Sequence, residues 1–228
     1  MSSQLPSIIE LEFARRYERE HARVCLEARP VGLARRLSLW RAEQLVRQAL
    51  KVAGEPGLIL DLACGAGRFW PVLAEHANRV ILAADNSQDM LDHAQTHHSP
   101  GLLERVKTFQ SSAFTIGLSV NAVDCIFCMQ LFQQIVSSEH RLLLLRELHR
   151  VSRDTVIVSV QVARSFRVRR HRSEGADLEA SAEAAKPPLA GKTQIEGEFR
   201  QAGFEILHSQ DFMPGCGLSR VYVLRKGS

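Results

Sequence analysis

Short apolar runs and helical periodicities alternate along most of the chain. Between residues 55 and 162, runs rich in Leu, Ile, Val and Phe stand between segments in which apolar residues recur every three to four positions. The runs lie at residues 58–60, 80–84, 106–109, 122–129 and 155–162. Buried strands that alternate with helices are typical of a parallel sheet covered on both faces. The pattern therefore predicts one doubly wound α/β domain.

Helices are predicted between these strands. Residues 68–78 form the first, and the second begins at a cap among residues 85–87 and ends near His98, before the break at Pro100-Gly101. A third helix spans residues 138–151. Its inward-facing residues are expected to be Leu142, Leu145, Leu148 and Val151.

The two ends of the chain depart from this alternation. Apolar residues at helical spacing over residues 8–50 predict two helices, which Pro30 and Gly32 separate. We therefore divide the chain into an N-terminal helical extension, residues 1–53, and a main domain, residues 54–228. Within the main domain, residues 164–190 break the pattern as an insert. A helix at 192–202 and an antiparallel strand pair at 204–211 and 220–225 complete the prediction.

Composition narrows the class of protein. The 228 residues are 45% hydrophobic and 24% charged, as in an ordinary globular protein. No apolar run reaches the ~18 residues of a transmembrane helix, and Glu10 and Glu12 interrupt any secretory signal. The five scattered cysteines predict reduced thiols in a cytoplasmic protein. The net charge of +4 is compatible with an anionic partner but does not require one.

The most informative stretch is Leu58–Phe69, in which a buried strand leads into a glycine turn. Gly65 and Gly67 give a backbone on which a ligand can approach N–H groups at the start of a helix. A dinucleotide fingerprint needs a third glycine where Trp70 stands, so a nicotinamide cofactor is disfavoured. Asp61, four residues before the first glycine, suits a ligand with positive charge nearby.

A second acid follows at the tip of the next predicted strand. Asp85 stands 24 residues after Asp61. An acid about 20 residues beyond a glycine turn can accept both hydroxyl groups of a ribose. A helix cap is the alternative, since Asp85, Asn86 and Ser87 are all residue types that cap helices.

Two segments resemble one protein family. Asp-Leu-Ala-Cys-Gly-Ala-Gly-Arg-Phe at residues 61–69 is similar to motif I of the Rossmann-like, class I S-adenosylmethionine-dependent methyltransferases. Asp-Asn-Ser-Gln-Asp-Met-Leu at residues 85–91 resembles their acid-x-Ser-x-x-Met-Leu segment. The likeness, to the type 11 small-molecule kind, spans about residues 55–162, with weaker support at 192–225. It implies a seven-stranded, mostly parallel sheet with an antiparallel C-terminal strand.

The resemblance implies S-adenosylmethionine as the cofactor. Asp61 would orient its ammonium group, and Asp85 would hold the ribose. Met90, Ser112 and Phe114 would frame the adenine. The complete set of implied cofactor-binding residues is Asp61, Ala63, Cys64, Gly65, Gly67, Asp85, Asn86, Met90, Ser112, Ala113, Phe114 and Met129. Relatives commonly place an acid where Ser112 and Ala113 stand, so the adenine contact departs from the family pattern.

The implied enzyme moves a methyl group to an oxygen, nitrogen or carbon nucleophile of a small molecule, mainly by proximity and alignment. Gln130, Gln133 and Gln134 follow the fourth strand, where ligands of open α/β sheets bind, so we expect them to contact the acceptor. Relatives often have histidine at this place, and glutamine cannot act as a general base. His140 and His208 are candidate bases, although surface histidines are the favoured interpretation.

Two other segments bear on the acceptor. By the same resemblance the N-terminal helices cover the cofactor cleft, with Tyr17 and Arg41 as candidate substrate contacts and ordinary packing as the alternative. The insert opens with the basic run Arg164–Arg172, at a place where many relatives insert a substrate-binding lid. This run predicts contact with an anionic substrate, an acidic partner or lipid headgroups, and a solvated loop is its alternative.

Because some residues differ from the family pattern, other functions have to be considered. Nucleic-acid base methyltransferases usually carry Asn/Asp-Pro-Pro-Tyr/Phe after the fourth strand, where this chain has Cys-Met-Gln-Leu-Phe, so a nucleic-acid substrate is not expected. An oxidoreductase is disfavoured by Trp70. The most serious rival is a non-catalytic cofactor-binding or partner-binding protein, because the adenine acid and the usual histidine are both replaced.

No metal site is expected. Cys125 and Cys128 stand three apart on a predicted strand, so their side chains should point to opposite faces. Asp89, His93 and His97 share one face of a predicted helix. Without a further ligand beside them, they favour a solvent-facing polar stripe over a metal centre.

Overall fold

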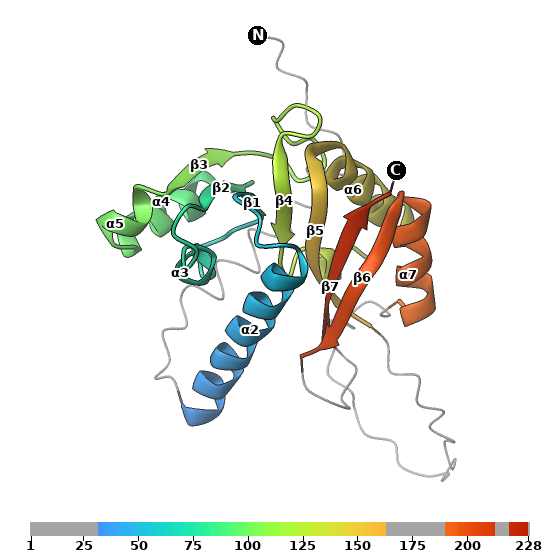
Figure 1. The fold of residues 1–228 in the computed structure, drawn as a ribbon, viewed down its shortest axis with the longest axis horizontal. Helices are drawn as coiled ribbons and strands as arrows, with labels where there is room; N and C mark the ends of the chain where they lie inside the picture. The colour runs from blue at the N-terminus through green and yellow to red at the C-terminus, as the bar shows by residue number, and fades with distance from the viewer. Residues whose placement is uncertain (1–31, 163–189, 213–218, 228) are drawn as a thin grey trace, which may run out of the picture.

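The computed structural model describes residues 32–162, 190–212 and 219–227. Within them a seven-stranded sheet carries helices on both faces (Figure 1). The strands are β1 (Leu58–Leu62), β2 (Val80–Asp85), β3 (Val106–Gln110), β4 (Val123–Cys128), β5 (Ser152–Gln161), β6 (Phe204–Asp211) and β7 (Ser219–Lys226). The helices are α2 (Leu33–Val52), α3 (Trp70–Leu73), α4 (Gln88–His97), α5 (Pro100–Leu103), the 3₁₀ turn η1 (Phe132–Gln134), α6 (Ser138–Val151) and α7 (Lys192–Gln201).

The strands follow the order β3-β2-β1-β4-β5-β7-β6. The first five strands pair in parallel, and β7 runs antiparallel to both β5 and β6. This confirms the predicted doubly wound sheet with an antiparallel C-terminal strand. The order reverses between β1 and β4, and ligands of such sheets bind beyond the carboxyl ends of the strands at that point.

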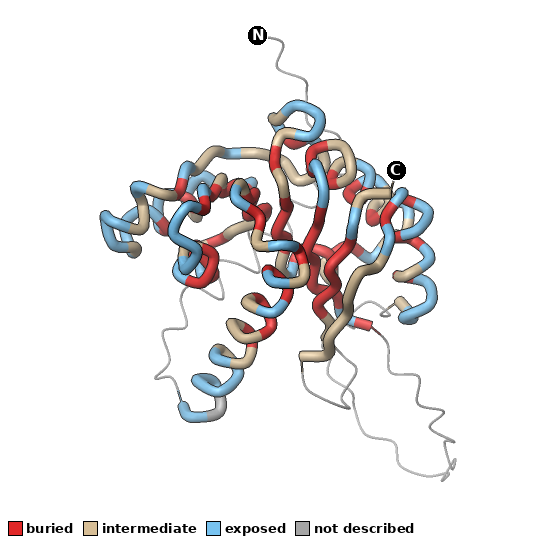
Figure 2. Tube along the Cα trace, in the orientation of Figure 1, coloured by how far each residue is buried: buried red, intermediate tan, exposed pale blue. Residues whose placement is uncertain are grey.

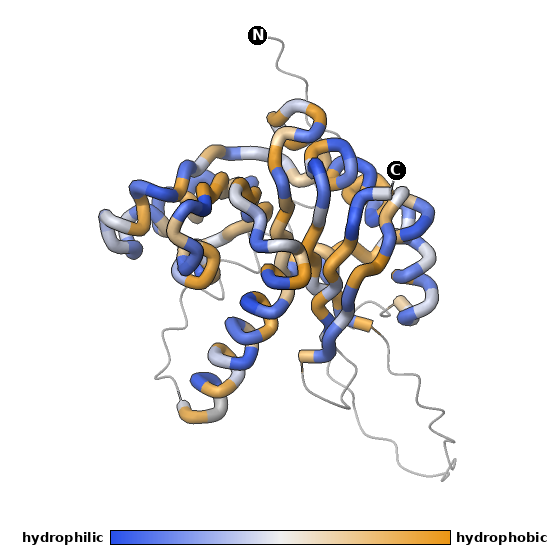
Figure 3. Tube along the Cα trace, in the orientation of Figure 1, coloured by the Kyte–Doolittle hydropathy of each residue, from blue (hydrophilic) through white to orange (hydrophobic). Residues whose placement is uncertain are grey.

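Two hydrophobic cores lie on opposite faces of the sheet. One is closed by α6 and α7, and the other by α2 and α3. Figure 2 shows buried residues running along the central strands, and Figure 3 shows that the same strands are hydrophobic. On β4, Cys125 belongs to the α2 side and Cys128 to the α6 side, so the two thiols point to opposite faces as predicted. Across the described ranges, no three His, Cys, Asp or Glu side chains group in a way that could hold a metal ion.

The helix predicted at 68–78 is much shorter than expected. Only Trp70–Leu73 is helical. The guanidinium of Arg79 donates to the Leu73 carbonyl at 2.9 Å, and that of Arg105 donates to the Ala74 carbonyl at 2.6 Å. These carbonyls would accept from the next helical turn if the helix continued. Side chains that follow later in the sequence therefore end it.

Two details differ from the prediction. The second helix ends at His97, close to the predicted His98, but Pro100 opens the separate helix α5, a position where proline is favoured because its missing N–H costs nothing. In α6, Leu142 is only half-buried and Leu144 takes its place in the core. The inward stripe of α6 is Leu144, Leu145, Leu148 and Val151.

The predicted domain division is partly outside the described residues. The second N-terminal helix is α2, which packs against α3, β6 and β7. The first N-terminal helix, with Tyr17, and the basic run Arg164–Arg172 lie outside the described residues. The division at residue 53 therefore stays a prediction. No helix in the described part of the chain is both long and apolar enough to cross a membrane.

Candidate functional site

The glycine turn after β1 wraps around a buried tryptophan. Ala63, Gly65 and Gly67 all have positive φ, at 58°, 54° and 70°. A Cβ atom on Gly67 would stand 2.5 Å from the indole of Trp70, closer than packed atoms approach. The second glycine of the motif therefore serves the packing of Trp70 as well as the backbone conformation. The same tryptophan occupies the position at which the sequence excluded a dinucleotide fingerprint.

Asp85 joins the tip of β2 to this turn. Its carboxylate is 1% exposed and accepts from the Gly65 N–H at 2.8 Å and the Ser87 N–H at 3.0 Å. Ser87 is the N-cap of α4, since its hydroxyl accepts from the Met90 N–H. The alternative role of Asp85 as the helix cap is therefore taken by Ser87. Asp85 is instead held at the carboxyl edge of the sheet.

Asp61 lies beneath the turn and is 3% exposed. Its Oδ2 accepts from the indole Nε1 of Trp70 at 3.0 Å. Burial raises its pKa to about 7, an effect that the Trp70 hydrogen bond opposes and the charge of Asp85 reinforces. A cation beside Asp61 would favour its ionised form. Burial also raises the pKa of the neighbouring Cys64 thiol, which is therefore not an activated nucleophile.

These residues fit the cofactor that the sequence implies. Asp85 ends β2 at the carboxyl edge of the sheet, where a carboxylate would accept from ribose hydroxyls. The buried Asp61 is the group whose charge an ammonium ion would compensate. S-adenosylmethionine bound at this edge would supply a sulfonium-activated methyl group.

The residues expected around the adenine lie at the neighbouring strand ends. The Ser111 N–H donates to the Asp85 carbonyl at 3.0 Å, which ties the end of β3 to β2. The Ser112 hydroxyl accepts from the Phe114 N–H at 3.2 Å. Met90, Ser112, Ala113 and Phe114 are half-buried, whereas Asn86 is exposed. The structure therefore brings the implied cofactor residues to one edge of β1, β2 and β3, apart from Met129.

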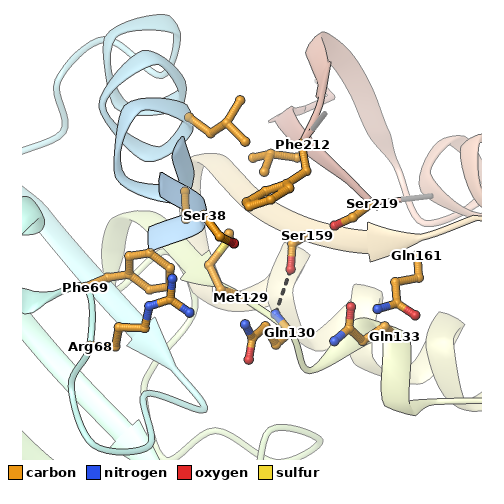
Figure 4. Close-up of a pocket in the computed structure, with 13 residues that line it drawn as sticks. Ser38, Arg68, Phe69, Met129, Gln130, Gln133, Ser159, Gln161, Phe212 and Ser219 are labelled. Atoms are coloured by element: carbon orange, nitrogen blue, oxygen red, sulfur yellow. Dashed lines mark hydrogen bonds between the residues drawn. The ribbon is translucent and has the colours of Figure 1, made fainter. Parts of the chain in front are cut away.

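A cavity of about 260 Å³ lies on the other side of the β1–β4 junction (Figure 4). We call it the amide-lined pocket, since three glutamine side chains contribute to its wall. It is lined by Ser38, Ala42, Leu45, Arg68, Phe69, Met129, Gln130, Gln133, Ser159, Gln161, Phe212, Ser219 and Val221. These residues come from α2, the turn after β1, the loop after β4, β5, and the β6–β7 region.

The sequence anticipated part of this pocket. Gln130, Gln133 and Met129 line it, but Met129 had been assigned to the cofactor. Gln134 is half-buried and does not line the pocket. Arg41 donates to the carbonyl of Phe212 at 3.0 Å and does not line it either.

Gln130 has an unusual backbone conformation. Its φ is 68°, and its N–H donates to the Ser159 hydroxyl of β5 at 2.7 Å. Positive φ at a non-glycine residue is uncommon and concentrates at ligand sites. The Ser159 bond therefore fixes the position from which Gln130 faces the pocket.

Several pocket residues were missed by the sequence-based prediction. Arg68 directly follows the glycine turn, and Gln161 is the last residue of β5. The rule that strand carboxyl ends face the crevice would have found Gln161. Phe212 and Ser219 had no such signal, because only the pairing of β6 and β7 brings them to the sheet. His140 and His208, the candidate bases, do not line the pocket.

Comparison with known proteins agrees with this geometry. Residues 59–155 match a family model described as a methyltransferase domain. No curated protein sequence matches the chain.

The fold is also seen in solved structures. Magnesium protoporphyrin IX methyltransferase (ChlM) from Synechocystis PCC 6803, solved with bound S-adenosylmethionine, is 16% identical, with a TM-score of 0.68 and 100% coverage of both chains. The [4+2]-cyclase SpnF is 19% identical, with a TM-score of 0.62 and 82% of each chain covered. An S-adenosylmethionine-dependent methyltransferase from Aquifex aeolicus is 20% identical, with a TM-score of 0.58 over 81% of this chain and 92% of that chain.

At these identities the structural likeness establishes the fold, and the family match adds the methyltransferase domain. Both agree with the glycine turn and the Asp85 segment from which the resemblance was first drawn. Over residues 59–155 the chain is therefore similar to the methyltransferase domain family, and its fold is the one seen in class I S-adenosylmethionine-dependent methyltransferases.

Proposed function

We propose that this methyltransferase acts on a small molecule that binds in the amide-lined pocket. The observation that carries the proposal is the position of the pocket, beside Met129 and Gln130 at the carboxyl end of β4. It adjoins the turn that carries the implied cofactor residues, since Arg68 and Phe69 belong to its wall. A donor on one side of the β1–β4 junction and an acceptor on the other would meet there.

The lining of the pocket bears on the chemistry. In methyl transfer the bond between sulfur and the methyl carbon breaks while a bond to the acceptor forms, and the electron pair stays on sulfur. Among the described residues that line the pocket, none is an acid, histidine, cysteine, tyrosine or lysine. The acceptor must therefore bring a nucleophile that is reactive without a protein base, and the protein contributes position and alignment.

The finer features stay proposals. Asp61, Gly65, Gly67 and Asp85 are the proposed cofactor contacts, supported by their shared edge and their hydrogen bonds. The anionic or lipid-associated character of the acceptor was inferred from Arg164–Arg172, outside the described residues. The cytoplasmic location, the covering role of the N-terminal helices and the acceptor atom likewise remain predictions.

The first experiment measures cofactor binding by isothermal titration of S-adenosylmethionine and S-adenosylhomocysteine into the full-length protein. Asp85→Asn keeps the shape of the side chain and removes its charge, so the dissociation constant should rise roughly 10–100-fold, as expected for hydrogen bonds to a charged group. Asp154→Asn is the matched control, since Asp154 is exposed on β5 and only weakly paired with Arg225. Equal affinity of both variants and the wild type would overturn the cofactor assignment.

The second experiment tests transfer itself. Methyl-labelled S-adenosylmethionine is incubated with the protein and a small-molecule extract or an envelope-lipid extract, and labelled products are identified by mass. Label in the first extract supports a small polar acceptor, and label in the second supports a lipid acceptor.

A non-catalytic protein of the same fold is the second candidate. Two observations favour it: the pocket lacks a titratable base among its described residues, and a [4+2]-cyclase shares the fold. Cofactor binding without label transfer to either extract would support this candidate over the proposed methyl transfer.

A further inference from the structure

The amide-lined pocket holds a single charged side chain among its described residues, that of Arg68. Arg68 follows the glycine turn directly, so its Cα is fixed by the turn that also holds Gly65 and Gly67. Figure 4 shows Arg68 and Phe69 on one side of the pocket, Gln161 and Ser219 on the other, and Met129 and Gln130 between them.

An aromatic platform orients the guanidinium. The Cζ atom of Arg68 lies 4.9 Å from the ring centroid of Phe69. Phe69 is itself buried and makes an edge contact with Phe127 of β4, with ring centroids 5.5 Å apart. A guanidinium that stacks on a fixed ring keeps its N–H fork free for a planar or tetrahedral oxyanion.

Arg68 lacks the counter-ion that several other arginines of the described chain have. Arg47, Arg79, Arg141, Arg150 and Arg153 each pair with a carboxylate within 3.3 Å. Arg68 makes no hydrogen bond or ion pair within the described part of the chain. The nearby Glu43, whose charge raises the pKa of Arg68, already accepts from Arg47. Arg68 is an exposed residue, and partial burial of its guanidinium has the larger effect and lowers its pKa.

The remaining polar groups of the pocket are neutral. Gln130, Gln133 and Gln161 provide amide donors, and Ser38, Ser159 and Ser219 provide hydroxyls. Phe69, Met129 and Phe212 add an apolar wall. One uncompensated cation, neutral donors and a flat apolar wall suit a small molecule with an oxyanion at one end and an apolar body.

We propose that Arg68 is an anion-binding residue of the amide-lined pocket, and that the acceptor therefore carries a carboxylate or phosphate group. As an acceptor assignment, this inference rests on the proposed function. The cavity of about 260 Å³ is smaller than the ~300–1,000 Å³ of drug-sized sites, so the acceptor portion that it holds is small.

Binding of small probes tests the inference without knowledge of the acceptor. The affinities of benzoate, phenyl phosphate and neutral benzamide are measured by NMR titration of the full-length protein, with and without S-adenosylhomocysteine. Benzoate or phenyl phosphate should bind the wild type at least tenfold more tightly than benzamide, and the preferred probe tells a carboxylate site from a phosphate site. Arg68→Gln should weaken oxyanion binding at least tenfold, and Arg68→Lys should weaken it less because the charge remains.

The matched control is Arg146→Gln, since Arg146 is an exposed arginine on α6 away from the pocket. It should bind all probes as the wild type does, and melting temperatures show that each variant is folded. Equal oxyanion affinity in Arg68→Gln and wild type would overturn the inference. A parallel loss of S-adenosylhomocysteine affinity in Arg68→Gln would also overturn it, because Arg68 would then bind the carboxylate of the cofactor. Probe binding is also measured without cofactor, so it tests the anion-binding role of Arg68 even if the proposed methyl transfer is not observed.

Discussion

The cofactor edge at β1–β2 and the amide-lined pocket at β4–β5 adjoin each other but are built differently. At the cofactor edge, Asp61 and Asp85 are 3% and 1% exposed, and both accept hydrogen bonds from groups of the turn or of Trp70. In the pocket, Gln130 and Gln161 are exposed. The side chains of Gln133 and Gln161 make no hydrogen bond within the described residues.

This difference separates two kinds of recognition. Buried carboxylates that accept hydrogen bonds from fixed donors are preorganised, and their geometry is costly to alter. Long amide side chains with free donors and acceptors can adjust to a ligand but lose rotamer freedom when they bind it. In the proposed function, rigid groups would therefore hold the methyl donor at the cofactor edge, and adaptable groups would hold the acceptor in the amide-lined pocket. Substitutions should change the free energy of unfolding strongly on the first side and very little on the second.

The largest effect is expected at Trp70, which is fully buried between the glycine turn and Asp61. Trp70→Ala should lower the free energy of unfolding by about 3–5 kcal/mol, the usual cost of removing a buried aromatic side chain. Trp70→Phe keeps most of the ring and leaves Asp61 without its indole donor, at a cost of about 1–3 kcal/mol. Urea denaturation measures both. A loss under about 1 kcal/mol for the alanine variant would contradict the rigid picture of this side.

The next effect depends on pH and concerns Asp61. Its pKa is about 7 in the folded protein against 3.8 as the ordinary value, so the unfolded chain releases this proton first. The folded state therefore loses stability as pH rises from about 4 to 7. Asp61→Asn removes this penalty and should raise the free energy of unfolding by up to about 4 kcal/mol at pH 8 and by little at pH 4.

Denaturation of Asp61→Asn at pH 4, 5.5, 7 and 8 tests this sign. Asp154→Asn, an exposed aspartate of β5, should show no comparable rise. The same Asp61→Asn protein should bind S-adenosylmethionine more weakly, because it lacks the charge opposite the ammonium group. A stability difference that stays constant across the four pH values would exclude the buried carboxyl as its cause.

A smaller loss is expected at Gly67. Its φ is 70° and an added Cβ would meet the Trp70 indole at 2.5 Å, so Gly67→Ala should destabilise by roughly 1–3 kcal/mol. Gly101→Ala is the control, since nothing lies within 4 Å of its Cβ position and its conformation is helical. The control should be neutral or gain up to about 1 kcal/mol. Thermal unfolding of the two variants would show similar shifts only if the turn were looser than the structure has it.

The smallest effect on stability is expected in the pocket. Gln161→Ala at the exposed end of β5 should change the free energy of unfolding by less than about 0.5 kcal/mol. Its effect should appear instead as weaker binding of the oxyanion probes, with S-adenosylhomocysteine affinity unchanged. A large loss of stability in Gln161→Ala would contradict the expectation that substitutions in the pocket affect stability much less than those at the cofactor edge.

The sequence predicted the cofactor side well because its signals are local. A strand, a glycine turn and an acid at the next strand tip all lie within residues 58–85, and their spacing reflects one structural unit. Trp70 was recognised there only as a missing glycine, since its bond to Asp61 depends on how the turn folds back. The short length of α3 was equally hidden, because Arg79 and Arg105 act from later in the chain.

The pocket was harder to predict because its wall combines distant segments. Ser38 on α2 and Ser219 at the start of β7 line the same pocket as Arg68. They are brought there by the order of the strands and by the packing of α2 on β7. No local pattern marks either serine. Gln130 and Gln133 were found since they follow a strand, whereas Gln134, one residue further, does not line the cavity. Polar residues near a strand end can thus be proposed from the sequence, but which of them line the cavity is known only from the three-dimensional structure.

The two thiols of β4, Cys125 and Cys128, can report separately on the opening of the two hydrophobic cores. Thiolates are the species that react with alkylating reagents, and burial raises the pKa of Cys125 to about 12 and that of Cys128 still further. Each thiol faces a different core, so each becomes reactive when its own side of the sheet opens. The alkylation rate of each thiol can be measured separately by peptide mass spectrometry. The two rates would show how readily the α2 side and the α6 side open around the same strand.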